Sequence, residues 1–137
     1  YGYIRDDNGN WRANIFSVPI IGGGDGGLFT CAADLDKLWR AVFANKVLPA
    51  EMTDQFLAPQ VRMGKDEENS TAYGLGVYVK NTNDNPVYYA VGGDFGIEFF
   101  TAYFPKQRIV ASALGNTELN SYPLLEAIIT DLSSTQP

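Results

Sequence analysis

The feature that most constrains the fold is a series of strand-like segments that follow one another along the second half of the chain. These segments are rich in β-branched and aromatic residues, are separated by turn residues, and cover 73–80, 87–91, 99–104 and 108–114. Consecutive strands with such short connections pair in antiparallel fashion, because a parallel pair needs a long crossover. The sequence therefore predicts an antiparallel sheet built from two successive hairpins.

Amphipathic helices are predicted on both sides of these strands in the sequence. Residues 28–45 carry an apolar stripe at helical spacing, with Thr30 as the best N-cap residue. The stripe consists of Leu35, Leu38, Trp39, Val42 and Phe43. A short second helix is expected between Pro49 and Pro59, and a third from Ser121, which we expect to act as its cap. We therefore expect the α+β class, with an antiparallel sheet flanked by helices.

The composition excludes several classes of function. The chain has 137 residues, typical of one domain, and its formal net charge of −6 gives no electrostatic footprint for nucleic acid or an anionic membrane. Because histidine is absent, the chain cannot form a Ser-His-Asp triad, a Cys-His dyad or a zinc site that needs imidazole. The single cysteine, Cys31, rules out an internal disulfide and is expected to be a buried apolar residue rather than a reactive thiol. We expect no cofactor and no metal site.

The N-terminal residues predict a short hairpin. Residues 6–10 are dense in turn formers and lie between Tyr3-Ile4 and Trp11. Their alternating carboxylate and amide side chains also resemble a calcium-binding loop, but Trp11 stands where that motif needs glycine, so we favour the turn. The apolar residues 15–21 are interrupted by Pro19, which predicts an edge or irregular strand rather than a central one.

A glycine-rich loop at residues 22–27 precedes the first predicted helix. Its first, third and sixth residues have the G-x-G-x-x-G spacing of loops that present a helix N-terminus to pyrophosphate. That motif needs a regular strand before it and a βαβ unit around it, whereas Pro19 interrupts the preceding segment and Asp25 adds negative charge. We favour the alternative that the loop forms a wall of a cleft, with Gly24, Asp25 and Gly26 as the candidate residues.

Two adjacent glycines, Gly92 and Gly93, follow directly on a strand-like segment. Glycine weakens a strand, so this pair indicates either a bulge or a place where another group closely approaches the backbone. A strand edge without side chains can donate its N–H groups to a carbonyl oxygen that becomes negatively charged, which stabilises an oxyanion without a charged residue. The sequence leaves both interpretations open.

The chain lacks the nucleophile signatures of common serine hydrolases. No serine is followed three positions later by lysine, and the patterns Tyr-x-Asn, Ser-x-Asn and Gly-x-Ser-x-Gly do not occur. These residues alone are therefore expected to be catalytically inactive, even if they contribute stabilising groups to a site.

Four segments resemble motifs of serine β-lactamase-like proteins, which include class C β-lactamases, penicillin-binding D,D-peptidases and related esterases. Gly26-Gly27-Leu28-Phe29-Thr30, followed by Asp34-Leu35, is similar to their Gly-Gly-Leu-x-Ser/Thr and Asp-Leu segment. Tyr73-Gly74-Leu75-Gly76-Val77 resembles their Tyr-Gly-Leu-Gly-Trp strand, and Gly92-Gly93-Asp94-Phe95-Gly96-Ile97 resembles their Gly-Gly-x-Pro-Gly-Phe run. The family's closing hairpin is similar to the segment with Pro105, Ile109-Val110-Ala111 and Gly115-Asn116. The resemblance covers nearly the whole chain, in the family's order.

This resemblance implies a partial β-lactamase/transpeptidase-like fold, with residues 1–137 as a single C-terminal segment of a larger domain. It implies acyl transfer or hydrolysis of a β-lactam, D-alanyl peptide or ester through a serine acyl-enzyme, with the nucleophile upstream of this chain. Gly93 matches the position whose backbone N–H completes the family's oxyanion hole, while Gly92 would lie along the substrate and Asp94 would shape the rim. Ala90 and Val91 stand where the family has Lys or His and then a small hydroxyl residue or glycine. The cationic or hydrogen-bonding handle for a substrate carboxylate is therefore missing at these two positions, and a Lys or Arg elsewhere would have to replace it.

Two other functions stay open at this point. Ala90 and Val91 favour a non-catalytic binding or sensing homologue of the same fold, and an unrelated α+β interaction domain could use Trp11, Tyr88 and Tyr89 as interface aromatics. The expected partner is a small-molecule or peptide substrate in the complete protein, with no nucleic acid. Self-association, or association with a missing N-terminal part, is also expected. The resemblance suggests a secreted or cell-envelope location.

Overall fold

A six-stranded antiparallel sheet forms the centre of the molecule in the computed structural model, which describes residues 1–63, 71–82, 85–117 and 121–134. Neighbouring strands in the sheet are also neighbours in the chain. The strands are β3 Val61–Arg62, β4 Thr71–Tyr73, β5 Tyr78–Thr82, β6 Asn85–Asp94, β7 Ile97–Phe104 and β8 Ile109–Gly115. This arrangement confirms the predicted antiparallel sheet.

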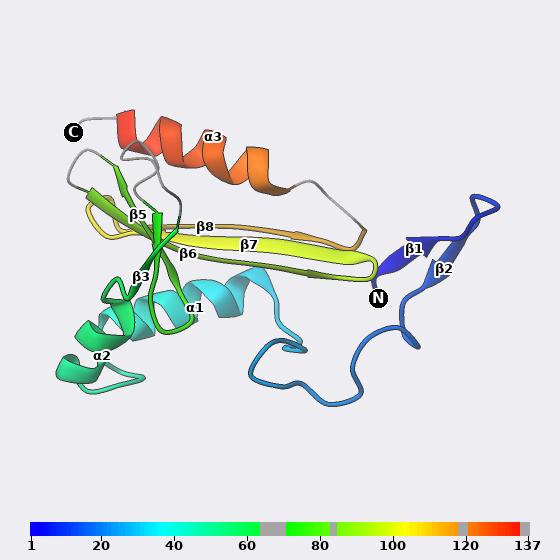
Figure 1. The fold of residues 1–137 in the computed structure, drawn as a ribbon, viewed down its shortest axis with the longest axis horizontal. Helices are drawn as coiled ribbons and strands as arrows, with labels where there is room; N and C mark the ends of the chain where they lie inside the picture. The colour runs from blue at the N-terminus through cyan, green and yellow to red at the C-terminus, as the bar shows by residue number, and fades with distance from the viewer. Residues whose placement is uncertain (64–70, 83–84, 118–120, 135–137) are drawn as a thin grey trace.

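Helices cover both faces of the sheet, so the main body has three layers (Figure 1). The helices are α1 Ala32–Phe43, α2 Ala50–Leu57 and α3 Ser121–Ser134. Helix α3 lies over one face, and α1 and α2 lie against the other. The predicted α+β class is therefore confirmed. Among the described residues, no helix is both long enough and apolar enough to span a bilayer.

Each face of the sheet has its own apolar core, because successive side chains of a strand point to opposite faces. On the α3 face the buried residues are Val87, Tyr89, Phe100, Ala102, Phe104, Leu125 and Ile129. On the other face they are Trp39, Val42, Leu57, Val77 and Tyr103. Burial of each large apolar side chain contributes roughly 1.5–3 kcal/mol, so the two cores together fix α1 and α3 on β7.

A buried polar contact links α1 to the sheet. The indole Nε1 of Trp39 donates a hydrogen bond of 2.8 Å to Oγ1 of Thr101 on β7, and Thr101 Oγ1 lies 2.7 Å from Ser112 Oγ on β8. Because Thr101 is only 3% exposed, an unpaired indole N–H here would cost the desolvation energy of the group. The contact therefore sets the position of α1 along the sheet.

Helix α1 is shorter than the predicted segment 28–45. It begins at Ala32, and Cys31 occupies the N-cap position without a side-chain hydrogen bond. The prediction that Thr30 caps the helix is wrong, since its hydroxyl lies 3.5 Å from the Cys31 carbonyl oxygen instead. Leu38 of the predicted stripe is 45% exposed.

The predicted strand over 73–80 is interrupted in the structure. Gly74 N donates a 2.7 Å hydrogen bond to the Val77 carbonyl oxygen, and Gly76 has a φ of +96°. These residues form a turn that brings Tyr73 opposite Tyr78, so β4 and β5 are two strands rather than one. The alternating apolar residues predicted one continuous strand, but Gly76 supplies the left-handed conformation that closes the turn.

One further segment differs from expectation, and another falls outside the described residues. Residues 15–21 form turns and irregular chain, without a strand. From the polar and charged residues 64–71 a solvent loop is expected; residues 64–70 lie outside the described residues, and Thr71 is the first residue of β4.

The N-terminal hairpin forms as predicted, with β1 Tyr3–Arg5 paired to β2 Trp11–Ala13. The Asp6 carboxylate holds its turn, since Oδ1 accepts hydrogen bonds from the backbone N–H groups of Asn8, at 3.0 Å, and Asn10, at 2.8 Å. The Asn10 hydrogen bond is the main cause that lowers the pKa of Asp6. These hydrogen bonds support the interpretation of residues 6–10 as a turn.

This hairpin packs against the turn between β6 and β7 (Figure 1). The buried Asn14 side chain accepts a hydrogen bond from Gly2 N at 3.0 Å and donates one of 2.9 Å to the Phe95 carbonyl oxygen. Tyr3 N donates to the carbonyl oxygens of Gly96, at 3.2 Å, and Asn116, at 2.8 Å. The turn at the end of β6 is thus fixed by the first residues of the chain.

Replacement of Gly96 tests this packing, with Gly9 as a matched control. Both glycines have positive φ, +73° and +82°, but a Cβ on Gly96 would lie 2.8 Å from the Tyr3 carbonyl, whereas a Cβ on Gly9 meets nothing within 4 Å. We expect Gly9→Ala to cost about 1 kcal/mol of unfolding free energy and Gly96→Ala at least about 2 kcal/mol, measured by urea denaturation. Equal costs for the two variants would contradict the close approach.

Candidate functional site

Strand β6 extends beyond its neighbour β5. The pairing of β5 with β6 ends at Tyr78 and Tyr89, whereas the pairing of β6 with β7 continues to Asp94 and Ile97. Among the described residues, therefore, the stretch from Ala90 to Asp94 is paired on one side and unpaired on the other. Strand β6 is not an edge strand of the sheet, but it has an open edge over its last residues.

The ladder between β6 and β7 is continuous. Gly92 lies opposite Phe99, Gly93 lies opposite Glu98, and no residue is inserted between Tyr88 and Asp94. The interpretation of the two glycines as a bulge is therefore wrong. Space explains Gly92, because a Cβ there would lie 2.6 Å from the Phe99 ring, but the surroundings of Gly93 would accept a Cβ at ordinary contact distances.

The register indicates which main-chain groups face the open edge. Phe95 and Gly96 form a two-residue turn, and in such a hairpin the flanking residues, here Asp94 and Ile97, direct their main-chain groups toward each other. Because the direction alternates along an antiparallel strand, the N–H and C=O groups of Gly93 and Val91 point away from β7, toward the side that β5 does not reach.

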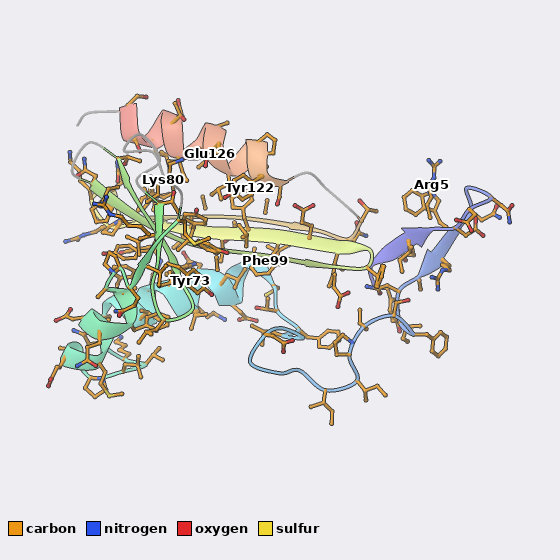
Figure 2. All side chains as sticks on the ribbon, viewed as in Figure 1. Arg5, Tyr73, Lys80, Phe99, Tyr122 and Glu126 are labelled. Carbon is orange, nitrogen blue, oxygen red and sulfur yellow. The ribbon has the colours of Figure 1, made fainter. Side chains whose placement is uncertain are left out.

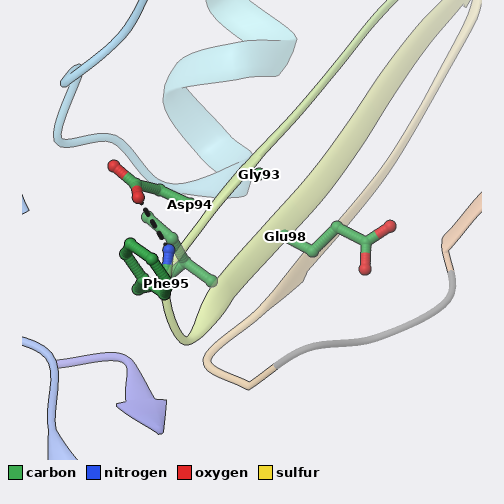
Figure 3. Close-up of a pocket in the computed structure, with 5 residues that line it drawn as sticks. Gly93, Asp94, Phe95 and Glu98 are labelled. Carbon is green, nitrogen blue, oxygen red and sulfur yellow. Dashed lines mark hydrogen bonds between the residues drawn. The ribbon is translucent and has the colours of Figure 1, made fainter.

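Two shallow depressions adjoin this edge. One, of about 380 Å³, is lined by Gly93, Asp94, Phe95, Ile97 and Glu98. The other, of about 290 Å³, is lined by Val91, Gly92, Gly93, Glu98, Phe99, Ser121 and Tyr122. Figure 3 shows Asp94 and Glu98 on opposite sides of the hairpin. Gly93 and Glu98 line both depressions, so they lie at the centre of the candidate site.

Glu98 connects the candidate site to α3. Its Oε1 accepts hydrogen bonds from the backbone N of Ser121, at 3.0 Å, and from the Ser121 hydroxyl, at 2.5 Å. A carboxylate at a helix N-terminus is stabilised by the unpaired N–H groups and the helix dipole. Ser121 was expected to cap α3 with its own side chain, but it is the first helical residue, and Glu98 accepts its N–H and O–H.

Ala90 and Val91 place no polar side chain beside the edge. Ala90 lies opposite Thr101 on the α1 face, and Val91 packs against the apolar core on the α3 face. The rim near the turn is formed by Asp94, whose Oδ1 accepts a 2.7 Å hydrogen bond from Phe95 N. The candidate residues of β6 thus lie together, with a carboxylate at one end and apolar groups at the other.

The glycine-rich loop does not contribute to either depression. Gly24, Asp25 and Gly26 are exposed, and the loop is closed on itself by the pairing of Gly23 with Gly26. The described sheets contain no parallel pair, so the βαβ unit that a dinucleotide site needs is missing from them. The role of these residues as a cleft wall stays a prediction.

Cys31 differs from its predicted environment, and Tyr89 does not suit the interface role that one of the alternative functions gave it. Cys31 is exposed rather than buried, and its Sγ donates a hydrogen bond of 3.3 Å to Asp34 Oδ2. Tyr89 is 1% exposed and therefore cannot serve as an interface aromatic. Burial raises the pKa of its hydroxyl, and the hydrogen bond with Tyr122 raises it further, so Tyr89 is a neutral core residue at physiological pH.

Sequence reasoning missed Glu98, Ser121 and Tyr122 as neighbours of the glycine pair. The signal for Glu98 was present, because a two-residue turn at 95–96 places residue 98 opposite residue 93. Ser121 and Tyr122 belong to a helix that reaches the site through packing on the sheet, which no local pattern reveals. Within the described residues, no group of three or more side chains with metal-ligand chemistry comes together.

Comparison with known proteins identifies the fold. Neither the protein-family models nor the curated proteins give a match. Among solved structures, the chain is similar to the penicillin binding protein from Bacillus halodurans, with a TM-score of 0.82 and 32% identity over 94% of this chain and 39% of that one. It is also similar in fold to the octameric penicillin-binding protein homologue from Pyrococcus abyssi, with a TM-score of 0.72 and 21% identity over 96% and 30% of the two chains. The chain therefore has a penicillin-binding-protein-like fold and spans less than half the length of either protein.

Proposed function

We propose that this chain is the C-terminal segment of a larger β-lactamase-like domain and supplies one half of a serine acyl-transfer site. In this proposal a serine on polypeptide outside residues 1–137 attacks an amide or ester, and the open edge of β6 binds the acyl group. The observation that carries the proposal is the absence of a paired strand beside Ala90–Asp94 among the described residues.

The role proposed for Gly93 is to donate its backbone N–H to the carbonyl oxygen of the substrate. That oxygen becomes negatively charged in the tetrahedral intermediate, and a fixed N–H in a partly dry site stabilises it more in the transition state than in the ground state. The register supports this role, because the N–H of Gly93 faces the open edge. Gly92 has no side chain, so the substrate backbone can lie along the strand.

The length of the open edge suits an extended acyl peptide. Ala90 to Asp94 spans about 13 Å at the usual rise of a strand. An extended peptide that pairs with such an edge gains main-chain hydrogen bonds, and the neighbouring side chains then determine its specificity. A D-alanyl peptide, an ester with an acyl chain or a β-lactam could each present a carbonyl to Gly93.

A non-catalytic homologue that binds the same ligands is the second candidate function. Ala90 and Val91 favour it, because they replace the Lys or His and the small hydroxyl residue or glycine that the family's motif carries at these positions. Both candidates require the same open edge, and they differ in whether a nucleophile is present on the rest of the polypeptide.

Association with further polypeptide is also proposed. Large apolar side chains are exposed in the segment before α1: Phe16, Ile20, Ile21, Leu28 and Phe29 are between 75% and 100% exposed. Exposed apolar surface of this kind is typical of interfaces. Either the remaining part of the domain or a second copy of the chain is proposed to cover it, and the octameric assembly of one structural relative makes self-association a reasonable expectation.

A matched pair of variants at Gly93 tests the proposed donor. Gly93→Ala keeps the N–H and adds a Cβ at ordinary contact distance, 3.4 Å from the Ile97 carbonyl oxygen, whereas Gly93→Pro removes the N–H at a position that does not face β7. With acetyl-D-alanyl-D-alanine amide as the probe, we expect chemical-shift changes at residues 90–94 in the native chain and in Gly93→Ala. We expect at least about fivefold weaker binding in Gly93→Pro, since one charge-neutral hydrogen bond is lost. Equal binding by the two variants would exclude Gly93 as the donor.

The absence of a nucleophile gives a second expected outcome. Because the chain has no Ser-x-x-Lys motif and no histidine, incubation with a fluorescent penicillin should produce no stoichiometric covalent adduct in intact-mass spectra. An active serine β-lactamase in the same assay is the control. A stoichiometric adduct on residues 1–137 would show that the chain carries its own nucleophile.

A further inference from the structure

The turn that ends the open edge of β6 has a conformation that a β-hairpin does not favour by itself. Phe95 and Gly96 are its two central residues; Gly96 has a φ of +73°, and Phe95 does not have a positive φ. In a two-residue turn this combination of φ angles is that of type II. Two-residue hairpins prefer types I′ and II′, because types I and II splay the flanking strands. Contacts from outside the hairpin are therefore expected to hold this turn.

The two residue types do not settle the orientation of the peptide between Phe95 and Gly96. The primed turns need a positive φ at residue 95, which is unfavourable for Phe. Types I and II remain, and they differ by a rotation of about 180° of the central peptide, which Gly96 permits because glycine adopts either sign of φ. The two orientations send the Phe95 carbonyl oxygen in opposite directions, so a donor on one side selects between them.

Asn14 supplies this donor. Its Nδ2 donates a hydrogen bond of 2.9 Å to the Phe95 carbonyl oxygen, and its Oδ1 accepts one of 3.0 Å from Gly2 N. Asn14 is only 4% exposed, so rotation of the peptide would leave its buried N–H group without this partner and cost the desolvation energy of the group. The Asn14 side chain therefore stabilises type II relative to type I.

Close contact between main chains brings Asn14 to this position. A Cβ on Gly2 would collide with the Gly96 carbonyl oxygen, and a Cβ on Gly96 would lie 2.8 Å from the Tyr3 carbonyl. Asn14 N also donates a 2.9 Å hydrogen bond to the Gly2 carbonyl oxygen, so Gly2 and Asn14 bind each other through two hydrogen bonds. Figure 2 shows Arg5 on the part of the hairpin that extends beyond the end of the sheet. The inner end of the hairpin thus carries the contact with the turn.

The orientation of the Phe95–Gly96 peptide also affects the candidate site. Phe95 follows directly on Asp94, the last residue of β6, and both line the depression of about 380 Å³ together with Gly93. A rotation from type II to type I changes ψ of Phe95 and φ of Gly96 and moves a carbonyl and an N–H group at the end of this depression. The shape and polarity of the site beside Gly93 therefore depend on which turn is formed.

We propose that Asn14 is a positioning residue of the acyl-binding edge. Its hydrogen bond to the Phe95 carbonyl oxygen fixes the orientation of the Phe95–Gly96 peptide and, through it, the depression beside Gly93. The proposal rests on the function proposed above, because it concerns the site at which the acyl compound binds. Asn14 is not among the residues that line the two depressions, so it acts through the turn.

NMR of the free 137-residue chain tests the effect of Asn14 on the turn. In a type II turn the ψ of about +120° at residue 95 brings its Hα close to the amide proton of Gly96, which gives a strong NOE. We expect this NOE to lose at least about half of its intensity in Asn14→Ala, because the peptide then populates both orientations. Asn10→Ala is the matched control and should keep the NOE, since Asn10 Nδ2 donates to Asp6 Oδ2 in the exposed part of the same hairpin.

Proline at residue 95 provides a rescue that a purely structural role of Asn14 would not allow. Proline fixes a negative φ and, when glycine follows, is typical of type II turns, so it holds the turn without Asn14. The probe is acetyl-D-alanyl-D-alanine amide, followed through the amide resonances of residues 90–94. We expect Asn14→Ala to weaken its binding at least about threefold, and the double variant Asn14→Ala/Phe95→Pro to bind it within about twofold of Phe95→Pro.

Urea denaturation distinguishes positioning from stability. Proline at residue 95 does not replace the hydrogen bond that Gly2 N donates to Asn14 Oδ1. Asn14→Ala is therefore expected to lower the free energy of unfolding both with Phe95 and with proline at this position, whereas it weakens binding of the probe only with Phe95.

The outcomes separate this inference from the proposed function. A weaker NOE and weaker binding in Asn14→Ala, with binding restored by proline and neither effect in Asn10→Ala, support both. An unchanged NOE, unchanged binding or binding that proline does not restore overturns the inference and leaves the proposed function standing. An equal effect of Asn10→Ala also overturns the inference, because general loosening of the hairpin would then be the cause. The absence of shifts at residues 90–94 in the native chain overturns the proposed function and the binding role of Asn14 together, whereas the NOE still decides whether Asn14 selects the turn.

Discussion

The candidate site depends on the difference in length between two neighbouring strands. Strand β5 has 5 residues and β6 has 10, so the last residues of β6 are paired with β7 alone among those described. The turn over Gly74–Val77 limits β5 at this end, because the chain reverses there and packs against α2, where Leu75 N donates a 3.3 Å hydrogen bond to the Phe56 carbonyl oxygen. An unpaired strand edge can pair with another chain and cause aggregation, so proteins usually cover or shorten it. Its presence inside a sheet, beside two glycines, is what makes this edge a candidate for ligand binding.

Two independent contacts hold the open edge in place. Asn14 ties the turn after Asp94 to the N-terminal hairpin, and Glu98 ties the start of β7 to the N-terminus of α3. Both contacts use a partly or fully buried polar side chain whose hydrogen bonds are satisfied. Movement of the hairpin would break these hydrogen bonds and cost free energy. Donors that stabilise an oxyanion must be fixed before the reaction, because reorganisation during the reaction would cost part of their benefit. These two contacts fix the turn and the start of β7 next to the edge, as its proposed role requires.

The sequence predicted much of the fold but less of the site. Local patterns sufficed for the N-terminal hairpin, for the β7–β8 hairpin and for the presence of α3, because period and turn chemistry agreed there. They failed at residues 73–80, where alternating apolar residues outweighed two glycines, and at Thr30, where a good capping residue lies outside the helix. Gly93 was predicted as a site residue from glycine chemistry and a family resemblance, and Val91 from the resemblance alone. Glu98 and Tyr122 were not found, since their proximity arises from strand register and from the packing of α3 on the sheet.

Hydrogen exchange of the backbone amides in the free protein tests the central claim most directly, because it reports on the open edge without any ligand. Tyr89, Val91 and Gly93 direct their N–H groups to the same side of β6, but β5 reaches only Tyr89. The account predicts slow exchange at Tyr89, Ala90 and Gly92, and exchange at least roughly tenfold faster at Val91 and Gly93. Slow exchange at Gly93, comparable to that of Gly92, would show that its amide is already paired and would contradict the account.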